Sequence, residues 1–297
     1  MIQLKGLATE TQNEKTKDLD QLSITEILTI MNEEDNQVPK AIKEVIPEIE
    51  QAVQFVVTSF KVKGRLIYMG AGTSGRLGVL DAVECPPTFG TTPEQVVGLI
   101  AGGEKAFVKA VEGAEDSFEL GALDLKNIQL TANDTVIGIA ASGRTPYVIG
   151  GFDYAKMIGA KTVAIACNKD SKMASHADLA IEVSPGPEVL TGSTRLKAGT
   201  SQKLILNMIS TTSMIQMGKV YQNYMVDVQQ TNEKLCVRAQ NIVMDTTSCT
   251  RECAKENLEA ANGSVKLAIV MILLHCDVKT ALKKLDETAG HVRAAIK

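Results

Sequence analysis

A short glycine-rich loop is the first part of this sequence whose residues could do chemistry. The segment GAGTSGR, Gly70 to Arg76, follows the apolar run RLIYM and fits the spacing G-x-G-x-x-G. Such loops bind phosphate, because amides at the start of a helix point at the anion and the helix dipole favours negative charge. Thr73 and Ser74 add two hydroxyl groups. The loop therefore predicts a phosphate site.

Two nucleotide interpretations fit this loop poorly. A dinucleotide fold places an acidic residue about 20 residues on, at the end of the second strand, but the run VVGLIA ends in two glycines. A nucleotide P-loop has Lys and Ser or Thr where this chain has Arg76 and Leu77. What remains is a phosphate monoester held by amides and hydroxyls, or glycines that serve only close packing of a strand on a helix.

A second loop repeats the chemistry of the first. RLIYMGAGTSGR and TVIGIAASGRTP each place a serine, a glycine and an arginine directly after an apolar run. These residues are Ser74, Gly75 and Arg76 in the first loop and Ser142, Gly143 and Arg144 in the second. At the carboxyl ends of two parallel strands, the two loops would face one crevice, which is where open α/β sheets bind ligands.

The apolar runs that position these loops predict a parallel sheet. RLIYM, VVGLIA, TVIGIA and TVAIAC alternate with helical stretches, and a weaker candidate, LAIEV, follows His176. Non-alternating strands separated by helices are typical of a parallel sheet covered on both faces. Thr145 and Pro146 predict the start of one covering helix.

Helices are predicted at both ends of the chain. Residues 23–26, SITE, form a capping box. After Pro39, apolar residues recur at helical spacing and predict one long helix that ends at Gly64. Beyond Thr231 the patterning is helical only. The predicted domains are an N-terminal helical segment (1–55), a sheet domain (56–220) and a C-terminal helical bundle (221–297).

The composition excludes several classes of function. The 31 Lys and Arg against 35 Asp and Glu give a net charge of −4, which lacks the positive footprint of a nucleic-acid binder. The N-terminus does not resemble a secretory signal, and VKLAIVMILL is shorter than the roughly 18 to 20 apolar residues that span a bilayer. The six cysteines and three histidines lack the spacing of a metal site. We therefore expect a cytoplasmic protein without nucleic-acid or membrane partners and without a metal.

Four longer segments carry a resemblance to a known family. GAGTSGRLGVLDAVECPPTFG, AVEGAEDS, ASGRTPYVIGG and GSTRLKAGTSQKLILN resemble the N-acetylmuramic acid 6-phosphate etherases, a branch of the sugar isomerase (SIS) domain proteins. The likeness runs from about Leu22 to the C-terminal bundle. It implies an α/β fold with an SIS-type parallel sheet flanked by helices, a C-terminal bundle similar to a ubiquitin-associated (UBA-like) domain, and a homodimer.

The resemblance also implies a reaction. The etherases cleave the D-lactyl ether of N-acetylmuramic acid 6-phosphate, giving N-acetylglucosamine 6-phosphate and D-lactate in cell-wall sugar recycling. In the open-chain aldehyde the C2 proton is acidic, whereas the lactyl oxygen on C3 leaves only when protonated. One acid and one base suffice, without a metal or redox cofactor. The resemblance makes Glu84, in VECPP at the end of the first loop's helix, the acid, and Glu115, in GAEDS, the base.

Other residues near these motifs are candidate contacts to a sugar phosphate. Arg76 and Arg144 would steer phosphate or lactate, or else form surface ion pairs. Ser193, Thr194 and Lys197 in GSTRLKAGT are further candidates.

Two other functions stay open at this point. The glucokinase regulatory protein has similar loops, and a non-catalytic sugar-phosphate sensor of that kind has no need of Glu84 or Glu115. An aldose–ketose isomerase on the same fold needs a base near C2 but no acid at a C3 leaving group. Release of D-lactate would distinguish the etherase from both.

Overall fold

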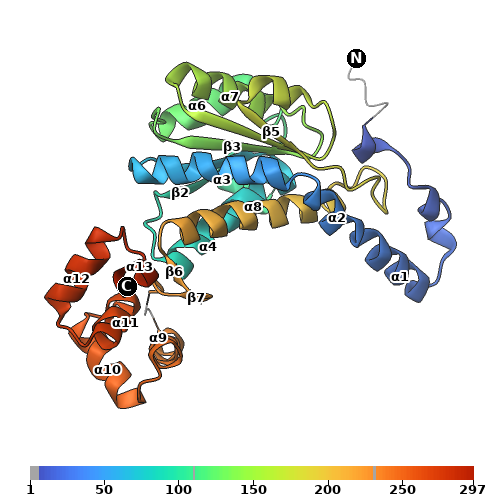
Figure 1. The fold of residues 1–297 in the computed structure, drawn as a ribbon. Helices are drawn as coiled ribbons and strands as arrows, with labels where there is room; N and C mark the ends of the chain where they lie inside the picture. The colour runs from blue at the N-terminus through green and yellow to red at the C-terminus, as the bar shows by residue number, and fades with distance from the viewer. Residues whose placement is uncertain (1–6, 110, 230–231) are drawn as a thin grey trace. The chain divides into compact units, whose positions relative to one another are not determined.

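Five parallel strands form the main sheet of this protein in the structure, a computed structural model that describes residues 7–109, 111–229 and 232–297 (Figure 1). The strand order is β2-β1-β3-β4-β5. The strands are β1 (Leu66–Gly70), β2 (Val96–Ile100), β3 (Thr135–Ala140), β4 (Lys161–Ala166) and β5 (Leu179–Glu182). All five predicted strands are confirmed. The strands β1 and β3 are continuous apolar runs in the sequence because they are buried along their whole length.

Helices cover both faces of this sheet, as Figure 1 shows. On one face, α6 (Phe118–Asn127) and α7 (Pro146–Ile158) pack in a core cluster that contains Met69, Leu125 and Phe152. On the other face, the Tyr68 hydroxyl donates to the Asp81 carboxylate of α4 (Gly72–Phe89) at 2.9 Å. That carboxylate also accepts from Ser210 of α8 (Lys197–Gln216) at 3.1 Å.

The predicted starts of two helices are confirmed. Ser23 and Glu26 form the reciprocal capping box of α1 (Ile24–Asp35). Helix α7 begins after Thr145 with Pro146 in its first turn and ends at Gly159, whose φ is +89°.

The single long helix predicted after Pro39 is wrong. The chain forms α2 (Gln37–Lys43) and α3 (Ile46–Lys61), with a break at Glu44 and Val45. Pro47 accounts for the break, because in a continuous helix it would have no N–H to donate to the Lys43 carbonyl and its ring would clash with that carbonyl. The apolar stripe continues across the break, which is why the periodicity did not reveal it.

The chain divides into two compact units, and the second is mainly helical. The first unit comprises Met1–Val83 and Glu94–Ser210, and the second Glu84–Pro93 and Thr211–Lys297. In the second, residues of five helices share one core, with the apolar α11 buried along most of its length. These helices are α9 (Glu233–Thr247), α10 (Arg251–Ala260), α11 (Val265–Leu274), α12 (Val278–Glu287) and α13 (Val292–Ala295). The helical patterning predicted beyond Thr231 is confirmed for the described residues.

Short elements complete the fold. They are the antiparallel pair β6 (Val220–Tyr221) and β7 (Tyr224–Met225), helix α5 (Lys105–Val108), and the 3-10 turns η1 (Ala8–Glu10), η2 (Glu14–Thr16), η3 (Leu19–Gln21) and η4 (Lys172–His176). Within the described ranges, no one helix is long and apolar enough to cross a membrane, and α10 with α11 meets that test only as a pair bent by 114°.

Candidate active site

The two Ser-Gly-Arg loops leave adjacent strands at the same edge of the sheet. Gly70 at the end of β1 pairs with Ile139 of β3, and the strands run parallel. From β1 the chain continues to β2 on one side, and from β3 it continues to β4 on the other. This is the topological switch point of an open α/β sheet, where the diverging connections leave a crevice for ligands. The predicted neighbourhood of the two loops is confirmed.

The first loop turns directly into α4. Ser74 lies in the first helical turn, is 7% exposed, and donates its hydroxyl proton to Oε1 of Gln202 on α8 at 2.9 Å. A Cβ placed on Gly75 would come within 2.5 Å of the Gly70 carbonyl oxygen. Close packing therefore accounts for Gly75, as one alternative proposed, while the hydroxyl of Ser74 remains at the edge where ligands bind.

Arg76 has a structural contact. Its guanidinium donates to the backbone carbonyls of Ala106 and Phe107, each at 2.8 Å, and so ties α4 to the short helix α5. Both bonds go to backbone carbonyls, and the roles of Arg76 as an anion contact or a surface ion-pair partner stay predictions.

The second loop is held against the segment that follows β4. Gly143 has a φ of +69°, and a Cβ at this position would lie 2.4 Å from that of Ser171. Its carbonyl accepts from Met173 N at 2.9 Å. The Ser142 hydroxyl oxygen accepts from the backbone N–H of Arg144 at 3.3 Å. The hydroxyl proton of Ser142 is not needed for that bond.

Glu115 lies beside the second loop. It is exposed in the connection between α5 and α6, and its Oε1 accepts from the hydroxyl of Thr145 at 3.1 Å. Its backbone carbonyl accepts from Tyr147 N at 3.0 Å. Two bonds to the start of α7 thus fix both the backbone and the carboxylate of this residue.

Replacing Thr145 with valine should lower kcat about tenfold while KM changes little. The substitution keeps the buried shape but removes the hydrogen bond that orients the Glu115 carboxylate, and a bond to a charged group contributes about 1.5 to 3 kcal/mol. Steady-state kinetics with Thr145→Ser, which keeps the hydroxyl, provide the control. A loss in Thr145→Ser with none in Thr145→Val would show that Thr145 acts through packing alone.

Glu84 is exposed on α4 and belongs to the second unit. As expected, Glu84 lies in the last part of this helix, which continues through Pro86 and Pro87 to Phe89. The amide of Gly90 donates to the Pro86 carbonyl at 2.9 Å and closes the last turn.

The third predicted segment lies next to the first loop. A Cβ built on Gly199, in the first turn of α8, would lie 3.5 Å from Cγ2 of Thr73. The Thr194 carbonyl accepts from Gly199 N at 3.0 Å, and the amide of Ser193 donates to Leu190 at 3.0 Å. The Glu188 carboxylate accepts from the first two amides of α8, each at 2.9 Å. An acidic side chain of the protein therefore already binds this helix N-terminus.

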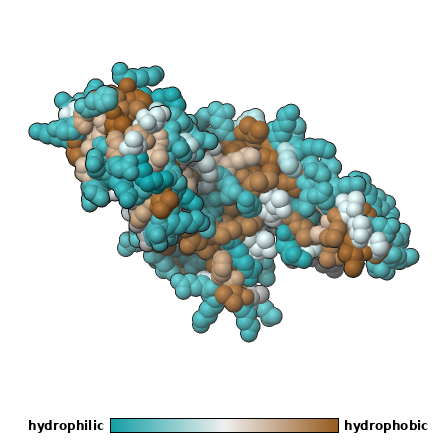
Figure 2. Space-filling model, turned by 90° about the horizontal axis from the view of Figure 1, so that it is seen from below, coloured by the Kyte–Doolittle hydropathy of each residue, from teal (hydrophilic) through white to brown (hydrophobic). Residues whose placement is uncertain are grey.

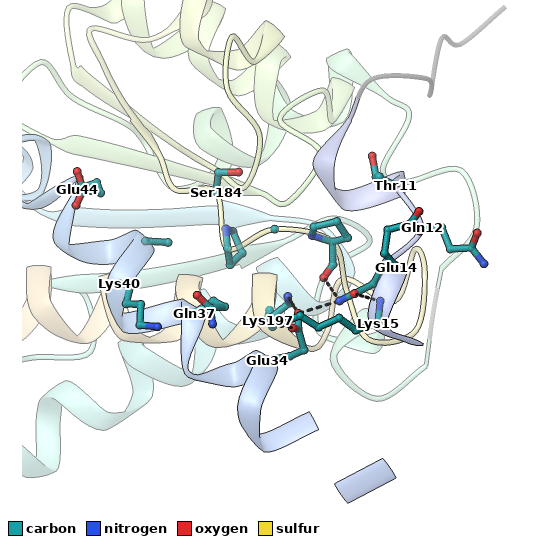
Figure 3. Close-up of a pocket in the computed structure, with 15 residues that line it drawn as sticks. Thr11, Gln12, Glu14, Lys15, Glu34, Gln37, Lys40, Glu44, Ser184 and Lys197 are labelled. Carbon is teal, nitrogen blue, oxygen red and sulfur yellow. Dashed lines mark hydrogen bonds and ion pairs between the residues drawn. The ribbon is translucent and has the colours of Figure 1, made fainter. Parts of the chain in front are cut away.

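Lys197 is buried and forms an ion pair. Its ammonium lies 2.7 Å from Oε2 of Glu34, at the end of α1, and the side chain is 1% exposed. Glu34 also accepts from Lys15 at 2.8 Å and from Asn13 at 2.8 Å (Figure 3). Burial of this carboxylate works to raise its pKa, but the three hydrogen bonds outweigh that and lower the pKa to about 2.

The groove in Figure 3 runs past this ion pair and has a volume of about 710 Å³. Its charged lining is mixed in sign: Glu14, Lys15, Glu34, Lys40, Glu44 and Lys197. Among the described residues, its lining includes Lys197 but neither serine of the two loops. The groove is therefore distinct from the crevice at the switch point.

Comparisons with known proteins agree with this geometry. Residues 48–156 match the family described as glucokinase regulatory protein N-terminal SIS domain, and residues 121–212 match the SIS domain family. A solved phosphoheptose isomerase from Francisella tularensis superimposes with a TM-score of 0.50 at 15% identity, covering 66% of this chain and 99% of its own. The sheet, its switch point and these matches define an SIS-domain protein.

Full-length relatives define the family more narrowly. N-acetylmuramic acid 6-phosphate etherase from Exiguobacterium sp. is 61% identical over 99% of this chain and 100% of its own length. N-acetylmuramic acid 6-phosphate etherase 2 from Lactiplantibacillus plantarum is 59% identical with the same coverage. The chain belongs to the N-acetylmuramic acid 6-phosphate etherase family.

Three side chains that bond to predicted site residues were not themselves predicted from the sequence as part of the site. Thr145 was recognised only as a helix start, although it also orients Glu115. Gln202 lies within the motif GSTRLKAGTSQKLILN, but nothing in its spacing indicates a bond to Ser74. Glu34 gives no local signal, because its partner Lys197 is 163 residues away in the chain.

Proposed function

We propose that this chain is a carbon–oxygen lyase that cleaves the D-lactyl ether of N-acetylmuramic acid 6-phosphate. The products are N-acetylglucosamine 6-phosphate and D-lactate, so the enzyme serves the recycling of cell-wall sugars. The observation that carries the proposal is the family membership over the whole chain. The pair of serine loops at the switch point supports it, since an anionic sugar needs such an anchor.

The phosphate is proposed to bind at the two loops. Backbone amides at the start of α4, with the hydroxyls of Thr73 and Ser74, approach it from the β1 side. Ser142 and Gly143 approach it from the β3 side. Arg144, Ser193 and Thr194 are proposed as further contacts to the sugar or its lactyl group. Hydrogen bonds to a charged group contribute about 1.5 to 3 kcal/mol each, so several of them hold a phosphate without a dedicated lysine.

The reaction needs one proton acceptor and one proton donor. In our proposal Glu115 takes the C2 proton of the open-chain aldehyde, the bond from C3 to the lactyl oxygen breaks, and Glu84 protonates that oxygen. D-lactate leaves, and a double bond joins C2 to C3. Water then adds its oxygen to C3 while a proton returns to C2. The two carboxylates exchange roles in this second half, and general acid–base catalysis contributes about 10² to 10⁴ per group.

A homodimer is proposed for this enzyme. Apolar side chains lie exposed beside the edge strand β2, and Val108 on α5 is 89% exposed. Phe107 and Val108 also line a hollow of about 550 Å³ next to Ile100. Figure 2 shows that apolar residues reach the surface of the molecule in separate patches among polar ones. Exposed apolar patches of this kind mark interaction surfaces, and a second copy would cover this one.

The cytoplasm is the proposed location, because a charged sugar phosphate does not cross a bilayer unaided. The substrate is then used in the compartment where its phosphate ester is formed.

The decisive experiment is to incubate the purified protein with N-acetylmuramic acid 6-phosphate and to assay D-lactate. The expected result is lactate in equal amount to N-acetylglucosamine 6-phosphate, with activity that persists in the presence of a chelator. Binding without turnover would instead indicate a sugar-phosphate sensor, and a ketose product without lactate would indicate an isomerase.

A further inference from the structure

Gln202 is a buried side chain with an unused hydrogen-bond donor beside the proposed phosphate site. The residue is 1% exposed, and its Oε1 accepts the hydroxyl proton of Ser74 at 2.9 Å. Its Nε2 is also buried and has no hydrogen-bond partner among the described residues. Buried polar atoms almost always have partners, because an unpaired donor loses its hydration without compensation. The unpaired amide therefore calls for an explanation.

The hydrogen bond between Ser74 and Gln202 conflicts with phosphate binding by Ser74. A serine hydroxyl has a single proton to donate. In the structure that proton is directed at Gln202 Oε1. A phosphate dianion offers only acceptors, so Ser74 can donate to it only after its proton has turned away from Gln202. The arrangement described here is thus the one in which Ser74 is not ready to bind an anion.

We infer that Gln202 is a positioning residue that directs the hydroxyl proton of Ser74 toward the phosphate. A half-turn of the Gln202 amide exchanges its oxygen and nitrogen. Nε2 then donates to the Ser74 oxygen, which releases the hydroxyl proton to a phosphate oxygen. The same turn gives the buried Nε2 the acceptor that it lacks. No covalent bond changes, and the inference rests on the proposed function because its ligand is the phosphate of the sugar.

The two helices hold Gln202 at a fixed place relative to Ser74. Ser74 and Asp81 lie about two turns apart on α4, and Gln202 and Ser210 lie about two turns apart on α8. Asp81 accepts from Ser210 at 3.1 Å. The helices are therefore linked by polar bonds at two levels. Because these bonds fix the backbone of Gln202, its side-chain amide can rotate but does not move away from Ser74.

A double-mutant cycle tests the inference. The variants are Ser74→Ala, Gln202→Met and the two combined, since methionine keeps the length of glutamine but has no N–H. We expect Gln202→Met to weaken the binding of inorganic phosphate, measured by calorimetry, at least about tenfold, and to raise KM similarly with kcat little changed. In the Ser74→Ala background the same substitution should have almost no further effect.

A control and a second readout make the outcome unambiguous. Ser201→Ala removes a buried hydroxyl in the same turn, one that donates to the Lys197 carbonyl of its own helix, and should leave phosphate affinity unchanged. If Gln202→Met does not fold, the side-chain amide NMR signals of Gln202 replace it. They should shift when phosphate is added to the parent protein but not to Ser74→Ala.

Three results would overturn the inference: independent, multiplicative effects of the two substitutions, unchanged phosphate affinity in Gln202→Met, or no phosphate binding by the parent protein. Failure of the parent protein to release D-lactate would overturn the proposed function instead. The calorimetric cycle would still decide the role of Gln202, because it requires no turnover.

Discussion

Glu84→Gln is expected to stop the release of D-lactate while hydrogen at C2 still exchanges with solvent. Glutamine keeps the size of the side chain but cannot protonate the leaving oxygen, so the C3–oxygen bond stays intact. The C2 proton is removed by the other carboxylate and returns from water. The expected fall in kcat is about 10² to 10⁴. Deuterium incorporation at C2, followed by NMR in heavy water, separates the two steps.

Glu115→Gln should abolish both exchange and lactate release, because it removes the proposed base. Glu112 provides a matched control, since it is exposed three residues earlier in the same connection and has no proposed role. Glu112→Gln should retain full activity. If Glu84→Gln loses exchange as well while Glu115→Gln retains it, the acid and the base have been assigned in reverse.

The sheet and its loops could be predicted from the sequence because their signals are local. Each strand is a short apolar run, and a parallel arrangement follows from the helices between the runs. Once β1 and β3 are neighbours, the two serine loops necessarily share an edge. The starts of α1 and α7 were predictable for the same reason, since the residues that mark a helix start lie within a few positions of the helix.

The rest of the site depends on pairs that are distant in sequence. The bond between Ser74 and Gln202 joins residues 128 positions apart, and the ion pair between Glu34 and Lys197 spans 163. The spacing of residues along the chain does not indicate which distant residues form such pairs. The break before α3 was not predicted for another reason. The apolar periodicity continues across it, and the prediction did not take the proline at position 47 into account. The carboxylates proposed as acid and base, Glu84 and Glu115, were separated from neighbouring acids only by family resemblance.

Lys197→Met is expected to lower the free energy of unfolding by about 3 to 5 kcal/mol. The substitution leaves the Glu34 carboxylate buried without its buried cation, and the other cation paired with it, Lys15, is 66% exposed and screened by water. Urea denaturation at neutral pH measures the loss. KM measured in the folded variant then shows whether Lys197 also contacts the substrate, as the family motif suggested, because a purely structural role leaves KM unchanged.

Two controls test whether the unpaired buried charge causes the loss of stability. Lys283 pairs with Glu287 at 3.8 Å with both side chains exposed, so Lys283→Met should change stability by less than about 1 kcal/mol. The double substitution Glu34→Leu with Lys197→Met removes both charges and should recover much of the loss. A double variant as unstable as Lys197→Met alone would mean that packing, rather than the unpaired charge, causes the effect.

The same carboxylate predicts how stability depends on pH. The pKa of Glu34 is lowered from its usual 4.5 to about 2 in the folded protein, so its contribution is fully present above about pH 4.5 and is lost as pH falls toward 2. At about 1.4 kcal/mol per pKa unit, the contribution is about 3 kcal/mol. Glu34→Gln should therefore flatten the acid limb of the stability curve by this amount. An acid limb that is identical in both proteins would show that the folded and unfolded states bind the Glu34 proton equally well.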